Sequence, residues 1–219
     1  MSEPITIPPA DPSDMIALHN VFREALGAAP AYVGSSDPGD RGRVDLVADY
    51  YFNVLELLRS HHRGEDEILT PRLLARCPER AGDISRIAGQ HEPVHASLED
   101  AAEHVGPWRD GPSAETSSAL ESALLTLEAG LVPHLSEEEE EILPLAARFM
   151  NAAEWGEFPA HGLANFHGDK VWLIIGLIQE QFTPDQVAGM EAHMPPPVVE
   201  FWRNEGRDLF VDFVGRLRG

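Results

Sequence analysis

The sequence predicts an all-α protein, an up-down-up-down four-helix bundle followed by a C-terminal helical extension. Apolar residues recur at spacings of three and four in four segments of the first 150 residues, and breaks rich in Pro and Gly separate these segments. No segment shows the alternation that is typical of a strand. Four amphipathic helices with short connections indicate such a bundle. We therefore expect the bundle over residues 1–150 and the extension over residues 151–219, packed on the bundle or on a partner subunit.

The bundle helices have start and stop signals. Ser13 and Asp14 can cap the first helix, and residues 30–42 read as a loop after it. Ser113 can cap the last bundle helix. The four helices are expected over about residues 13–28, from about Arg43 to Pro71, over about residues 82–105, and from Ser113 through Leu145.

The extension has weaker signals and no second catalytic constellation. We expect a break at residues 158–162, an apolar helix over 170–181 and a last helix over 198–217. Thr183 and Gln186 form a capping-box pattern for a further helix start. We predict that the extension serves as a lid or as the surface of a homodimer.

Charge and cysteine content exclude several classes of function. The chain has 16 Lys and Arg against 37 Asp and Glu, a net charge of −21, which disfavours binding to nucleic acid or to an anionic membrane surface. The apolar run of residues 171–178 is too short to span a bilayer, and residues 1–14 lack the pattern of a signal peptide. A single cysteine, Cys77, allows no internal disulfide. These features predict a cytoplasmic protein.

Histidine and glutamate lie on the apolar stripes of the predicted bundle helices. Residues four apart share one helix face, so three such pairs can each direct two side chains to one point. Imidazoles and carboxylates beside a single thiol favour a hard or borderline metal ion. The candidate metal ligands are His19, His61, Glu65, His91, His95, His134 and Glu138.

The order of these residues resembles that of the hemerythrin and HHE cation-binding family. That family has His on the first helix, HxxxE on the second, HxxxH on the third and HxxxE on the fourth. The stretches HHRGEDEILTP and HLSEEEEEILP are similar to the family's, and they repeat one spacing of His, Glu and Pro. The resemblance covers about residues 12–150.

The resemblance implies two non-haem iron ions joined by carboxylates and an oxo or hydroxo bridge. By analogy, Glu65 and Glu138 bridge the irons. One iron is completed by His91, His95 and His134, and the other is held by His19 and His61. The second iron then keeps an open position for a small molecule.

Several functions are compatible with this site. The first is reversible binding of dioxygen, or of nitric oxide, by a carrier or sensor. The alternative is a di-iron oxidoreductase that consumes peroxide, and a third is an iron-responsive interaction module. Residues 91–95 also match HExxH, the zinc-hydrolase motif, but Pro93 fits poorly inside that helix.

Two ligand positions stay open, and two prolines are expected to distort their helices. The resemblance leaves Glu139 as an alternative to Glu138, because some members of the family space the last carboxylate one residue further. His62 is an alternative to His61, because it also lies on an apolar stripe. Pro93 and Pro133 lie next to candidate ligands, where each removes a backbone hydrogen bond.

Overall fold

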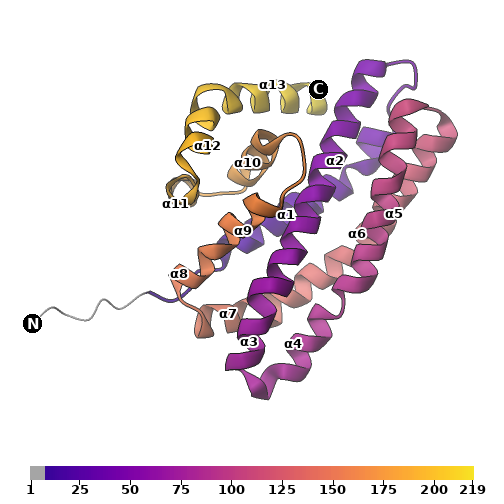
Figure 1. Cartoon of the computed structure of the whole chain (residues 1–219). Helices are drawn as coiled ribbons and strands as arrows, with labels where there is room; N and C mark the ends of the chain where they lie inside the picture. Colours follow the sequence, from indigo (N-terminus) through magenta and orange to yellow (C-terminus); the bar gives the residue numbers. More distant parts are fainter. Residues whose placement is uncertain (1–7) are drawn as a thin grey trace, which may run out of the picture.

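The computed structural model describes residues 8–219, which form helices joined by short connections (Figure 1). Within these residues there is no strand beyond one isolated bridge between Pro9 and Asn151. The predicted all-α class is therefore confirmed.

Four long helices form the bundle: α1 (Ser13–Gly27), α2 (Arg41–Gly64), α5 (His91–Asp110) and α6 (Ala114–Glu141). Each packs against two others, α2 on α1 and α5, and α6 on α5 and α1, an arrangement compatible with the predicted up-down-up-down order. Ser113 caps α6 as expected, with its hydroxyl accepting from the backbone N–H of Thr116. Pro133 does not interrupt α6, so the expected distortion there is not seen at the level of the helix.

The predicted second and third helices are both divided. The second continues past Gly64 as a π-helical turn (Glu65–Leu69) and then as α3 (Thr70–Arg76). A short 3₁₀ turn (Pro78–Arg80) leads to α4 (Ala81–Ala88), and α4 ends before α5 begins at His91. With α7 (Leu143–Phe149), these short helices close one end of the bundle (Figure 1). A second π-helical turn, Pro30–Gly34, occupies part of the predicted loop.

The extension is helical throughout most of its length. It comprises α8 (Ala152–Trp155), α9 (Glu157–Asn165), α10 (Val171–Glu180), α11 (Pro184–His193), α12 (Pro196–Phe201), a π-helical turn (Trp202–Gly206) and α13 (Arg207–Arg218). The capping box at Thr183 is confirmed. The predicted break at residues 158–162 is wrong, because Pro159 falls in the first turn of α9, where no backbone N–H is required.

The extension packs on α2 and shares its hydrophobic core. Leu173 and Ile175 of α10 and Phe213 of α13 are buried in the same cluster as residues of α1, α2, α5 and α6. The guanidinium of Arg43 donates to the carbonyl of Leu217 at 2.6 Å. The division of the chain at residue 150 stays a prediction. No helix within residues 8–219 combines the length and apolar character that crossing a membrane requires.

Candidate metal centre

Seven side chains from the four bundle helices and the π-helical turn meet in the interior, and none of these residues is more than 8% exposed. They form two groups whose ligand atoms lie within 4.8 Å of one another. One group is His62, Glu65, His91 and His134; the other is His19, His61, Glu65 and Glu138.

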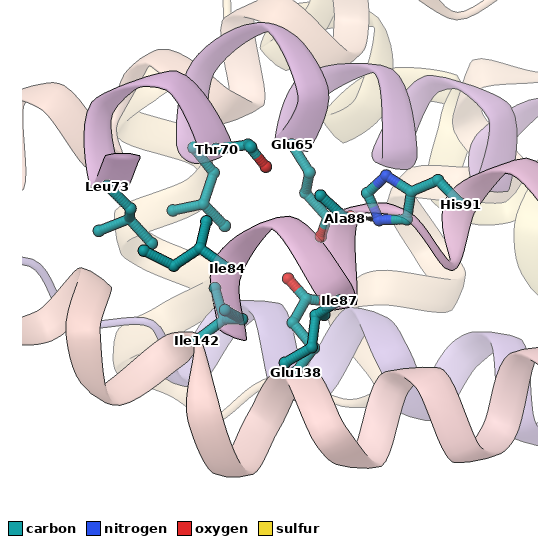
Figure 2. Close-up of a pocket in the computed structure, with 10 residues that line it drawn as sticks. Glu65, Thr70, Leu73, Ile84, Ile87, Ala88, His91, Glu138 and Ile142 are labelled. Carbon is teal, nitrogen blue, oxygen red and sulfur yellow. Dashed lines mark ion pairs between the residues drawn. The ribbon is translucent and has the colours of Figure 1, made fainter. Parts of the chain in front are cut away.

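Glu65 belongs to both groups and lies between them. Its Oε1 is 3.2 Å from His61 Nε2, and its Oε2 is 3.3 Å from His91 Nε2. Figure 2 shows Glu65 and Glu138 directed toward one another from opposite helices, with the contact to His91 drawn as a dashed line. The two oxygens of Glu65 thus reach one histidine of each group, the arrangement that a bridging carboxylate requires.

Glu138 occupies a second position between the groups. Its Oε2 lies 3.6 Å from His19 Nε2 and 4.0 Å from His134 Nε2. Glu138 therefore approaches a histidine of each group. Of the two glutamates, however, only Glu65 is a member of both groups of ligand atoms that lie within 4.8 Å of one another.

The atoms that face the centre lack partners within the described residues. Burying a polar atom without a hydrogen bond costs about 1–3 kcal/mol, so a fold that does it repeatedly at one point requires an explanation. A metal ion supplies it, because these are lone-pair atoms of types that bind metals. The unpartnered atoms are Nε2 of His19, His61, His62 and His134, both carboxylate oxygens of Glu65, and Oε2 of Glu138.

Three of the imidazoles are oriented by acceptors on their far side. The Nδ1–H of His19 donates to Glu139 at 2.8 Å, and that of His91 donates to Asp66 at 2.7 Å. The Nδ1–H of His134 donates to Oε1 of Gln90 at 3.0 Å. An acceptor at Nδ1 fixes the tautomer and leaves the Nε2 lone pair free for a metal. Glu139 thus holds a histidine of the cluster and lies outside both groups, whereas Glu138 lies in one.

Burial sets the protonation of the centre. It lowers the pKa of His61 to about 3 and that of His134 to about 4. Burial and the charge of Glu65 raise the pKa of Glu138 well above its usual range. Burial also opposes the charge of Glu65, but the neighbouring histidines, His61 first, hold its pKa well below the usual range. The neutral imidazole is the form that binds metal.

The structure does not bring His95 into the cluster. Its side chain is 58% exposed and lies 3.6 Å from Glu99. The reason is the break before His91, which lets α5 turn a stripe of Val94, Leu98 and Ala101 inward, and His95 lies one residue, about 100°, beyond Val94. The same break places Pro93 in the first turn of α5, so the expected kink is absent.

His62 occupies the place in the cluster that the sequence predicted for His95. At about 100° per residue, Glu65 lies between His61 and His62 around α2, so a helix that turns Glu65 inward brings both histidines with it. This spacing was a signal in the sequence that both, and not one of the two, face the centre. The π-helical turn that begins at Glu65 had no such signal. Turns of this kind are common at functional sites.

A small cavity borders the two glutamates. It offers about 10 Å³ to the centre of a water molecule, roughly the space that a single water requires. Its wall is mainly aliphatic (Figure 2). The lining residues are Glu65, Leu69, Thr70, Leu73, Ile84, Ile87, Ala88, His91, Glu138 and Ile142.

These features define a helical bundle with a buried cation-binding cluster of histidine and glutamate. The family described as "Hemerythrin HHE cation binding domain" matches residues 12–146. This match covers more than half of the chain, and the protein belongs to that family. No curated protein and no solved structure matches the chain.

Proposed function

We propose that the chain holds two non-haem iron ions. In this proposal His62, His91 and His134 bind one iron, and His19 and His61 bind the other. Glu65 and Glu138 bridge the two, together with an oxo or hydroxo group. The observation that carries the proposal is the pair of buried ligand groups that share Glu65.

The unequal histidine count supports an open position. Three imidazoles stand on one side of the bridging carboxylates and two on the other, so the second iron has one protein ligand fewer. When bound, the iron pair would supply reversible electron exchange with a small ligand. The aliphatic wall beside Glu65 and Glu138 limits water, and the cavity has room for a ligand about the size of one water molecule.

These features favour a carrier or sensor of dioxygen or of a related molecule such as nitric oxide. Leu73, Ile84 and Ile87 line the cavity and provide no proton to a bound ligand. An apolar wall supports reversible binding, because cleavage of an O–O bond requires a nearby proton donor. We propose a cytoplasmic protein, with a homodimer through the extension as a further expectation.

The second candidate is an oxidoreductase that consumes peroxide. Thr70 favours it, because this residue brings a hydroxyl to the otherwise aliphatic part of the cavity wall (Figure 2).

Metal analysis and visible spectra of the reduced protein, before and after exposure to air, test the proposal. We expect two irons per chain and an absorption band that appears with oxygen and disappears when oxygen is removed. Peroxide turnover without a stable adduct would favour the oxidoreductase. A single zinc ion per chain would contradict the di-iron proposal.

A further inference from the structure

The extension contacts the bundle at the π-helical turn that carries Glu65. The imidazole of His161 in α9 donates through Nε2 to Glu67 Oε2 at 2.8 Å. Seven residues before Glu67, the hydroxyl of Ser60 donates to the carbonyl of Gly162 at 2.9 Å. The extension lies outside residues 12–146, so the family match does not account for these contacts.

Gly64 lets α9 lie close to the backbone immediately before Glu65. A Cβ atom at Gly64 would lie 3.5 Å from His161 Nδ1 and 3.5 Å from a ring carbon of Phe158. Around α2, Ser60 lies about 200° from His62, so α9 covers the side that faces away from the cluster. The turn is therefore held between the metal centre on one side and α9 on the other.

The segment after the turn is held from the same direction. Arg72 of α3 donates to the backbone carbonyl of Glu154 at 3.2 Å, and Arg76 donates to the carboxylate of Glu154 at 2.8 Å. Helix α9 thus contacts the chain before and within the π-helical turn, and α8 contacts α3, which follows the turn. Such turns are rare, occur mostly as single-turn bulges within α-helices and are frequent at functional sites.

We propose that His161 is a positioning residue of the metal centre, which holds Glu67 and thereby keeps Glu65 between the two ligand groups. Its Nδ1 is buried without a partner, so the bond from Nε2 to Glu67 is the polar contact that fixes the ring among the described residues. Relaxation of the turn toward an α-helix would rotate the residues that follow Gly64 relative to His61. The inference rests on the proposed di-iron function.

The test compares full-length variants for iron content and for resistance to a chelator. His161→Ala removes the donor, His161→Gln keeps an amide nitrogen near the position of Nε2, and His161→Asn is too short to reach Glu67. His193→Ala is the matched control, because His193 also lies in the extension and, among residues 8–219, hydrogen-bonds within its own helix, to the carbonyl of Gly189. We expect His161→Ala and His161→Asn to hold the second iron about 10- to 100-fold more weakly, whereas His161→Gln and the control keep two irons.

A second variant removes the acceptor of the same hydrogen bond. Glu67→Ala alters a half-exposed side chain, so the fold should tolerate it, and we expect the same loss as in His161→Ala with little further loss in the double variant. Two tightly held irons in His161→Ala would overturn the inference alone. So would failure of His161→Gln to restore binding. A wild-type chain without two irons would overturn the proposed function itself.

Discussion

The imidazole rings of His62 and His91 stack, with centroids 4.5 Å apart and 18° between their planes. They come from different bundle helices, α2 and α5, and belong to the same ligand group. Their contact shows that the third imidazole of this group comes from α2, next to His61, and not from a second histidine on α5. The stacking also restricts both rings to the orientations seen at the centre.

The first prediction separates His62 from His95. We expect His62→Ala to lose iron, because it removes one of the three imidazoles of its group, and His95→Ala to retain two irons, because that side chain is exposed. Iron per chain, measured after gel filtration, checks this. His91→Ala and His134→Ala should also lose iron, whereas His193→Ala should not. Equal loss from His62→Ala and His95→Ala would contradict this ligand set.

Gln90 gives the second prediction. Its side-chain carbonyl accepts from Nδ1 of His134, and its amide donates to Glu137 at 3.1 Å. Gln90→Leu removes the acceptor, so we expect iron affinity about 10- to 100-fold weaker. Competition with a chelator measures it. Unchanged affinity would mean that packing alone orients His134.

The third prediction concerns the pH dependence of the metal-free protein. The folded pKa values of His61 (about 3), His62 and His134 (about 4) lie below the usual 6.5, so at pH 5 to 6 the unfolded chain binds more protons at these sites. Stability should therefore fall as the pH drops below about 6.5. Glu138 and His91, whose pKa values are raised, act in the opposite direction, but they are two groups against three.

Urea unfolding of the metal-free protein at pH 7 and at pH 5.5 measures this dependence. The free energy of unfolding should be lower at pH 5.5. A free energy of unfolding that is higher at pH 5.5 would show that Glu138 and His91 outweigh the three histidines whose pKa values are lowered. Iron-loaded protein is the comparison, since bound metal excludes protons from the same nitrogens.

The fourth prediction tests the cavity wall. Ile87→Ala removes buried aliphatic atoms beside Glu138, so we expect a loss of about 2–5 kcal/mol of stability. The larger cavity should admit water and larger anions, so azide should bind faster and the oxygen adduct should decay faster. Stopped-flow absorption measures both rates. Unchanged rates, with two irons bound, would place the ligand elsewhere.

Most of the fold and of the cluster could be predicted from the sequence, because the apolar stripes of the helices determine both. A polar residue on a buried stripe must find a partner, and this placed His19, His61, Glu65, His134 and Glu138 in the interior. The prediction for His95 was wrong because helical spacing relates residues to one face only while the helix is continuous, and the predicted third helix is interrupted before His91. No clear signal in the sequence indicated that Gly89 and Gln90 divide the third helix.

The contacts of the extension could not be predicted from periodicity. The approach of α9 to Gly64 depends on how distant segments pack, and a glycine within a helix has the same spacing whether or not a neighbour lies against it. The π-helical turn is similar, because its extra residue changes the helix phase without leaving a residue-type signature at Glu65.

The contact between Arg43 and Leu217 joins residues 174 positions apart along the chain, and it sets an order of assembly. A ribosome that adds about 5–20 residues per second completes Glu138 about 4–16 s before it reaches Leu217. During that interval all seven side chains of the cluster exist, while α13, which packs on α2, is not yet complete. The last helix therefore packs over the bundle only after every side chain of the cluster has been made.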